Sequence, residues 1–168
     1  PTMFSFNSPL GMCPQCNGLG EHYEFDIDLI IDPAKTVGDG AVRMWGPVKK
    51  KKSTYLYSTA KQILSKFGAD LDTPWTSISE EGRQAILHGG VQVSSHWENE
   101  RGSGDYEYIT EGVFKVLKRR YKQTNSESSR RWYQSFRSQQ PCEACRGKRL
   151  RRESLAVTIG SVNIDDLM

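Results

Sequence analysis

Two stretches of the chain place apolar residues at the spacing of an amphipathic helix. Residues 53–67 predict the first helix, because these apolar side chains fall on or beside one face: Tyr55, Leu56, Ala60, Ile63, Leu64 and Phe67. Gly68 is expected to end it. A second helix is predicted from Ser79, whose side chain can cap the N-terminus, to His88, before the glycine pair at 89–90.

The pattern after the second helix predicts a β-hairpin. Residues 91–97 and 106–110 have strand character, and they flank a turn rich in Gly, Asn and Asp that includes residues 101–105. Upstream, residues 21–52 lack periodicity and carry Gly and Pro, which predicts turns and short extended pieces. The four-lysine run at 49–52 is interpreted as an exposed loop, with a phosphate contact as the alternative.

The segment from Glu111 to Gln140 begins with a helix that has a cationic stripe. Four cations recur at i, i+3, i+4 and i+7: Lys115, Lys118, Arg119 and Lys122. Apolar residues cluster on the other side: Val113, Phe114, Leu117 and Tyr121. Arg120 lies outside the stripe, beside Val113 and Val116, so we expect its side chain to be partly buried.

A further helix is predicted after a break at residues 124–126. Its apolar side carries Trp132, Tyr133 and Phe136, with Arg130 and Arg137 on another side. A helix that presents cations in register fits a phosphate backbone, which makes these side chains candidates for nucleic-acid contact. A well-solvated helix face is the alternative.

Charge is unevenly distributed along the chain. The net charge of the 168 residues is +3, but residues 113–152 hold thirteen Lys or Arg against the two acids Glu127 and Glu143. This asymmetry favours a polyanionic partner for one face. Hydrophobic residues make up 36% of the chain and the mean hydropathy is −0.62. With no predicted membrane span or signal peptide, we expect a cytoplasmic protein without membrane partners. The first residues, Pro1 to Phe6, suggest an excised fragment.

Four cysteines form two pairs of identical spacing. Cys13 and Cys16 form one Cys-x-x-Cys turn, Cys142 and Cys145 form the other, and glycines follow both. This is the pattern of zinc knuckles, and two knuckles supply the four thiolates of a structural site. Disulfides are the alternative, which the missing secretory signal and the poor geometry within one turn disfavour.

The gap between the knuckles, residues 17–141, is unusually long. Closing a flexible loop of that length costs about 4 kcal/mol. A structural zinc site supplies about 10–16 kcal/mol, so one shared metal can hold both ends together. In the alternative, each knuckle completes its own site with residues outside this chain.

Sequence motifs for catalysis are missing from the chain. It has no phosphate-binding loop, no G-x-S-x-G and no H-E-x-x-H. The three histidines, His22, His88 and His96, lack metal-ligand spacing and are interpreted as surface or packing residues. We therefore expect a non-catalytic chain.

Four segments carry a pattern that is found elsewhere: residues 4–20, Glu111-Gly112-Val113, Arg119-Arg120-Tyr121-Lys122 and residues 141–150. In this order they resemble segments of the UvrA family, the damage-sensing ATPases of bacterial nucleotide excision repair. The resemblance implies the insertion domain of that family with its flanking zinc module. It implies duplex DNA, the rest of a UvrA chain, its dimer mate and excision-repair proteins as partners. ATP is implied only for the full-length protein. The family's further Cys-x-x-Cys, just upstream of this segment, is an alternative partner for Cys13 and Cys16.

These observations predict an α+β chain with a four-cysteine zinc base. The expected division is a first knuckle at 1–20, an inserted domain at 21–140, and a second knuckle with a following strand at 141–168. The expected function is a DNA-contacting or DNA-confining module. The alternatives are a mobile flap or protein-docking surface without DNA contact, and a stand-alone zinc-dependent RNA-binding protein. The candidate DNA-contacting residues are Lys115, Lys118, Arg119, Lys122, Arg130 and Arg137.

Overall fold

The computed structural model describes residues 2–52, 54–99 and 102–167. The chain divides into two compact units. One combines residues 1–24 with 137–168, and the other comprises residues 25–136. Helices and small antiparallel sheets make up both, which confirms the predicted α+β class.

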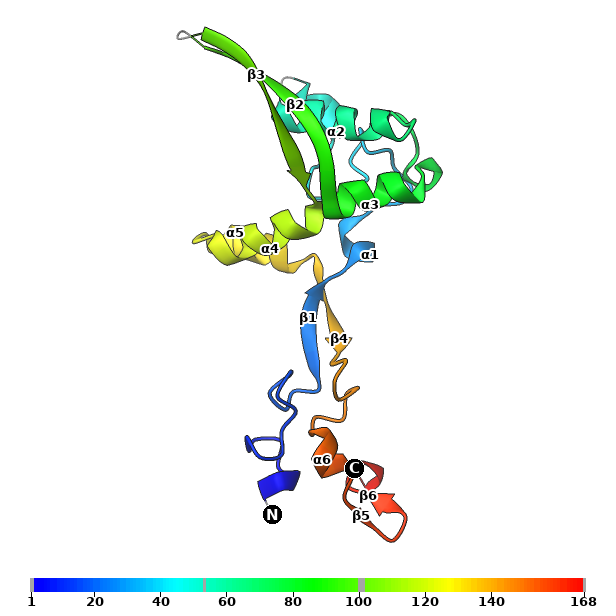
Figure 1. The fold of residues 1–168 in the computed structure, drawn as a ribbon, viewed down its shortest axis with the longest axis vertical. Coiled ribbons are helices and arrows are strands. Elements are labelled where there is room, and N and C mark those ends of the chain that lie inside the picture. Colours follow the sequence, from blue (N-terminus) through cyan, green and yellow to red (C-terminus); the bar gives the residue numbers. More distant parts are fainter. Residues whose placement is uncertain (1, 53, 100–101, 168) are drawn as a thin grey trace. The chain divides into compact units, whose positions relative to one another are not determined.

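The larger unit packs helices beside a long hairpin. Figure 1 shows β2 and β3 running together (green), with α3 leading into the hairpin and α4 following it. The elements are α1 (Ile27–Ile30), the 3-10 turn η2 (Val48–Lys51), α2 (Tyr55–Lys66), η3 (Trp75–Ser77), α3 (Glu80–His88), β2 (Gly89–Asn99), β3 (Gly102–Glu111), α4 (Val113–Gln123) and α5 (Glu127–Gln134).

The two helices predicted from periodicity are confirmed, and their ends have clear local causes. Thr54 accepts a hydrogen bond from the Tyr57 N–H and caps α2, which ends before Gly68 at φ +69°. Ser79 accepts from the Gly82 N–H at 3.2 Å and caps α3, as predicted. Ser53, at the predicted start of the first helix, lies outside the described residues.

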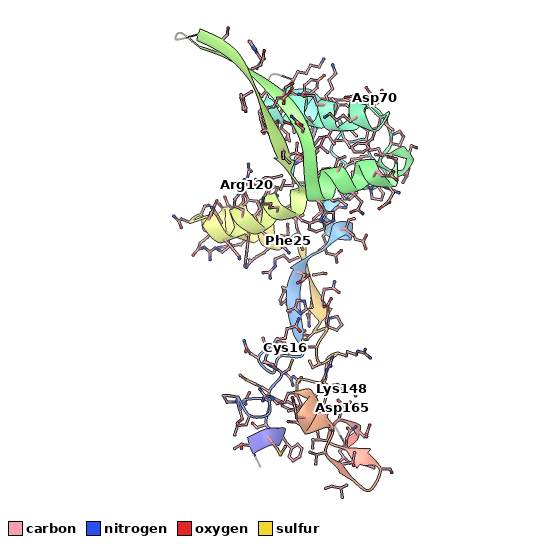
Figure 2. All side chains as sticks on the ribbon, viewed as in Figure 1. Cys16, Phe25, Asp70, Arg120, Lys148 and Asp165 are labelled. Atoms are coloured by element: carbon pink, nitrogen blue, oxygen red, sulfur yellow. The ribbon has the colours of Figure 1, made fainter. Side chains whose placement is uncertain are left out.

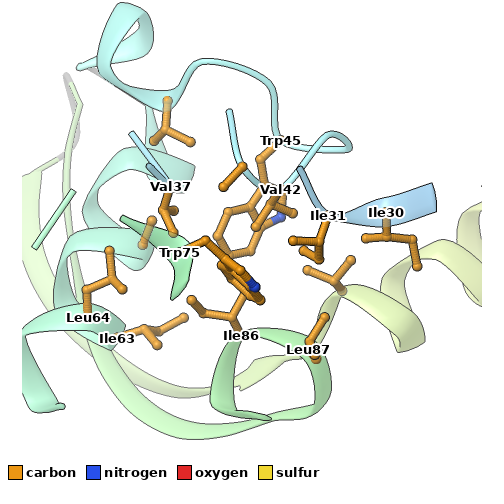
Figure 3. Close-up of a cluster of buried hydrophobic side chains, with 14 of the residues drawn as sticks. Ile30, Ile31, Val37, Val42, Trp45, Ile63, Leu64, Trp75, Ile86 and Leu87 are labelled. Carbon is orange, nitrogen blue, oxygen red and sulfur yellow. The ribbon is translucent and has the colours of Figure 1, made fainter. Parts of the chain in front are cut away.

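The core of the larger unit forms around two tryptophans. Trp45 and Trp75 are 9% and 5% exposed, and aliphatic side chains from α2 and α3 surround them (Figure 3). The irregular segment before α2 folds onto this core through an isolated bridge between Ile31 and Val42. Lys49 is half-buried and pairs with Asp39 and Asp72. The lysine run is therefore not uniformly an exposed loop, in contrast to the prediction.

The hairpin is longer than the pattern predicted. Residues 102–105 belong to β3 and pair with residues 96–99 of β2, so their assignment to the turn was wrong. Backbone hydrogen bonding extends the ladder even where side chains do not alternate. His96 contributes a polar side-chain contact across the strands, its Nδ1 lying 2.9 Å from Asp105 Oδ1. Arg101 of the predicted turn lies outside the described residues.

The helix predicted to carry both Arg130 and Arg137 is shorter than expected. α5 ends at Gln134, because the Ser135 N–H turns back onto the carbonyls of the last helical turn. Phe136 is buried beyond its end, and Arg137 is the first residue of strand β4. The placement of Arg137 on a helix face was therefore wrong.

The smaller unit is built from the two ends of the chain. Strand β1 (Glu21–Phe25) pairs with β4 (Arg137–Pro141). Lys148 Nζ lies 2.6 Å from Asp165 Oδ2 (Figure 2), which ties the second knuckle to the last residues. The remaining elements are η1 (Thr2–Phe4), α6 (Arg152–Leu155), the pair β5 (Thr158–Ile159) and β6 (Val162–Asn163), and η4 (Asp165–Leu167). Within the described ranges, no helix has the length and apolarity needed to cross a bilayer.

Helix α4 is held to the larger unit by Leu117, whose side chain is fully buried. Leu117→Ala should lower the free energy of unfolding by about 2–5 kcal/mol, because it leaves a cavity beneath the helix. Lys118→Ala, at the exposed next position, should change it by about 0.5 kcal/mol or less. Urea unfolding of both variants checks this, and equal losses would contradict the packing of α4.

Candidate metal centre and cationic surface

The four cysteines meet in one buried cluster within the smaller unit. Their sulfur atoms all lie within 4.8 Å of one another. The Sγ atoms of Cys13 and Cys142 are 3.9 Å apart, and those of Cys16 and Cys145 are 3.7 Å apart. These distances exclude disulfides, which need about 2.0 Å.

The two knuckles pair by reciprocal backbone hydrogen bonds. The Cys13 N–H donates to the Arg149 carbonyl at 2.8 Å, and the Cys142 N–H donates to the Gly20 carbonyl at 2.9 Å. Each acceptor lies four residues after the second cysteine of its own knuckle. The same two contacts thus occur twice, related by exchanging the knuckles. Local symmetry of this kind brings two cysteine pairs to a common point.

The backbone conformations repeat in the same way. Asn17 and Arg146 directly follow the second cysteines and have φ values of 51° and 52°. Gly18 and Gly147 come next, at 77° and 86°. The left-handed turn folds the backbone around the sulfurs. At Gly18 a Cβ would lie 2.1 Å from the Phe6 carbonyl oxygen, so this position excludes any side chain.

The geometry of the cluster fits a tetrahedral ion. Four sulfurs at about 2.3 Å from a central zinc lie about 3.8 Å from one another. The separations of 3.7 and 3.9 Å bracket that value, and all four cysteines are 4% exposed or less. The Gly20 N–H also donates to Cys16 Sγ at 3.2 Å, an outer contact typical of a thiolate ligand.

Protonation of the cluster depends on its surroundings. The backbone N–H of Cys145 lowers the pKa of the Cys142 thiol to about 7. Burial raises the pKa of Cys145 to about 12. Four thiolates this close cannot all be charged unless a cation compensates them, and a bound divalent metal provides that charge.

The predicted cationic stripe lies on α4. Its four members are all exposed: Lys115, Lys118, Arg119 and Lys122. Glu111 at the start of the helix pairs with two of them, 2.8 Å from the Arg119 guanidinium and 3.7 Å from Lys115 Nζ. The hydrogen bond from Arg119 holds the pKa of the Glu111 carboxyl below its ordinary value. Among the described residues, Lys118 and Lys122 have no carboxylate partner within ion-pair distance.

The other predicted contacts are placed differently. Arg130 is exposed on α5 and donates to the Thr124 carbonyl at 2.9 Å, at the end of α4. Arg137 is half-buried and donates a hydrogen bond to the Tyr23 carbonyl. Its guanidinium carbon lies 5.8 Å from the centre of the Tyr23 ring. Its guanidinium is thus engaged within the β1–β4 pair.

The expectation that Arg120 is partly buried was wrong. Its side chain is exposed on α4 (Figure 2), although Val113 is buried and Val116 is half-buried. The flank of the helix beyond Val116 borders an open cavity, and Arg120 lines that cavity instead of entering the core.

Comparisons with known proteins agree with this architecture. The model of the UvrA DNA-binding domain family matches residues 26–135. This chain belongs to the UvrA DNA-binding domain family. UvrABC system protein A of Streptococcus mutans is 37% identical over 164 residues, covering 95% of this chain and 17% of that protein. The same protein from Lactococcus lactis is 40% identical over 167 residues, covering 98% and 17%.

A solved structure matches as well. UvrA2 from Deinococcus radiodurans aligns with a TM-score of 0.63 and 27% identity, covering 98% of this chain and 21% of that one. The chain thus spans about a fifth or less of the length of these UvrA relatives. The resemblance to UvrA inferred from the sequence is confirmed.

Some features of this site were missed by reasoning from the sequence. The reciprocal backbone contacts join Cys13 to Arg149 and Cys142 to Gly20, far apart in the sequence, and the identical spacing of the two motifs was the available signal. Arg120 was expected to be partly buried from its position on a helical wheel. A wheel shows which residues share a face, but it does not show whether another element covers that face.

One shared site and two separate sites predict different metal contents. If all four cysteines hold one ion, Cys16→Ser and Cys145→Ser should each reduce bound zinc from one equivalent per chain to nearly none. Inductively coupled plasma mass spectrometry of the purified chains measures the zinc content. Gln15→Ser, at an exposed position between Cys13 and Cys16, is the control. Two equivalents per chain, falling to one in either variant, would contradict a shared site.

Proposed function

We propose that this chain is a DNA-contacting module of a UvrA-type excision-repair ATPase, in which α4 lies against the phosphate backbone of a duplex. The carrying observation is the row of four exposed cations on one helix. Phosphates recur regularly along DNA, so cations spaced over two helical turns can contact several of them without reading bases. The match to the UvrA DNA-binding domain supports the same partner.

The cations of α4 are not equivalent in this proposal. Lys115 and Arg119 share Glu111, which offsets part of their charge. Lys118 and Lys122 have no such partner among the described carboxylates, so approaching a phosphate costs them no existing ion pair. These two lysines supply most of the electrostatic attraction, and the contact is independent of sequence.

Zinc has a structural role in this proposal. Cys13, Cys16, Cys142 and Cys145 hold it in a closed, buried site without a position for substrate. A zinc bound to four thiolates fastens the first residues of the chain to the last. The chain itself carries out no catalytic step, and ATP hydrolysis belongs to other parts of a full-length UvrA.

One observation favours a second candidate, a mobile flap or protein-docking surface. Glu111 neutralises part of the stripe from within the chain, as it would on a helix face whose charges serve solubility. In that case DNA affinity would not depend on the α4 lysines.

The double variant Lys118→Gln with Lys122→Gln tests the proposal. It should weaken duplex binding by about tenfold or more at about 0.1 M salt, because two phosphate contacts are lost. It should also reduce the slope of log affinity against log salt by about 1.8. Fluorescence anisotropy with a labelled duplex at several salt concentrations measures both.

The matched control is Arg43→Gln with Lys61→Gln, two exposed cations outside the lysine run at 49–52. It removes the same charge from positions outside α4, so it should leave the slope close to that of the unmodified chain. Both variants should keep their stability within about 0.5 kcal/mol per site. Equal salt slopes for the two double variants would refute contact by α4 and favour the docking surface.

A further inference from the structure

A cavity of about 540 Å³ lies in the larger unit, bordered by α2, β3 and α4. Its walls include Tyr55, Tyr106, Tyr108, Ile109 and Arg120. Tyr55 is 54% exposed, Tyr106 47% and Ile109 69%, so the apolar wall opens to solvent. A volume of this size is typical of small-ligand sites.

The tyrosines form an aromatic surface that is fixed by ring stacking and a hydrogen bond. The ring centroid of Tyr108 lies 5.3 Å from that of Tyr55, and these two rings are stacked at an interplanar angle of 27°. The centroid of the Tyr106 ring lies 5.7 Å from that of Tyr108. Thr59 donates its hydroxyl to the Tyr55 carbonyl at 2.8 Å, so the Tyr108 hydroxyl, 2.7 Å from Thr59 Oγ1, is the donor of that second bond. Tyr108 is thereby anchored, while Tyr55 and Tyr106 offer exposed ring surface.

The charge of the cavity wall is positive. Two guanidinium groups, Arg119 and Arg120, face one carboxylate, Glu111. Arg119 is paired with Glu111, whereas Arg120 has no ion pair with any carboxylate among the described residues. Burial, followed by the neighbouring Tyr108 hydroxyl, raises the pKa of Tyr55, so the phenol stays neutral. An apolar ring surface beside an unpaired cation fits a flat group that carries an anion.

We propose that this cavity binds one unpaired nucleotide of a DNA strand, with its base stacked on Tyr55 and Tyr106 and its phosphate against Arg120. Bases stack on aromatic side chains without regard to sequence. Arg119 belongs both to the cationic stripe and to the cavity wall, so a strand lying along α4 passes the cavity. The inference rests on the proposed DNA contact and adds a site for a base that has left the helix.

The test compares duplexes that differ only at one bulged nucleotide. One carries the fluorescent base 2-aminopurine in the bulge, one carries an abasic nucleotide there, and one is fully paired. A bulged base is already unpaired, so stacking it on protein costs less than extracting a paired base. The 168-residue chain should bind the 2-aminopurine bulge about tenfold more tightly than the abasic bulge. Binding should also change the fluorescence of the 2-aminopurine base.

Variants assign that preference to the cavity. Tyr55→Phe keeps the aromatic face and should keep the preference, whereas Tyr55→Leu keeps apolar volume without the ring and should lose most of it. Arg120→Gln should reduce the salt slope for the bulged duplex by about one phosphate contact. Free 2-aminopurine nucleotide should bind far more weakly than the bulged strand, because it lacks the flanking phosphates.

Equal affinity for the base and abasic bulges, or a preference that survives in Tyr55→Leu, would overturn the inference, as would no binding to the bulged duplex. Tight binding of the free nucleotide, equal to that of the strand, would overturn the assignment to DNA. The proposed α4 contact fails separately, through the salt slope of the fully paired duplex in the lysine variants.

Discussion

The pairing of the two Cys-x-x-Cys turns is the contact on which the smaller unit depends. The large hydrophobic core belongs to the other unit, and its buried residues all fall within positions 30–136 of the sequence. Among the described residues of the smaller unit, there is no hydrophobic core of comparable size. Its buried centre is the group of cysteines itself. Backbone hydrogen bonds from Cys13 to Arg149 and from Cys142 to Gly20 join the two turns around this group. Without a metal, four buried thiols and a few ladder bonds would have to offset the entropy of joining distant ends of the chain.

Glu111 connects the two surfaces of the larger unit to which we assign DNA. Its carboxylate holds Arg119 at 2.8 Å, at the point where the cationic stripe of α4 meets the tyrosine-lined cavity. That ion pair is solvent-exposed and adds little to stability. It does fix one guanidinium and leaves Arg120 as the cation of the cavity without a carboxylate partner among the described residues. The same short segment therefore sets the charge of both surfaces.

The parts of this structure that could be predicted from sequence have local causes. The caps at Thr54 and Ser79 and the stop at Gly68 act within one helical turn, and the apolar periodicity of α2 and α3 reports a buried face. The cysteine cluster was predictable despite its long range, because two identical motifs with soft ligands have few other chemical uses. The length of the strand Gly102–Glu111 was underestimated, since its glycine-rich first residues lack the side-chain pattern of a strand and yet pair with β2 through the backbone.

The parts that could not be predicted depend on which elements meet in space. Arg120 has the helical position of a residue beside the core, yet the space next to it is left open. Tyr55 and Tyr108 stack although they are far apart in the sequence, and nothing in either local pattern links them. Asparagine adopts the left-handed region more readily than most residues, so the conformation of Asn17 agrees with its residue type, whereas arginine has no such preference and the same conformation at Arg146 follows from the fold of the knuckle.

The central claim is that one ion joins both ends of the chain, and X-ray absorption at the zinc edge tests it most directly. The account predicts one zinc per chain, with a single shell of four sulfurs near about 2.3 Å. A shell containing nitrogen or oxygen, or a second metal per chain, would mean that the knuckles do not share one site.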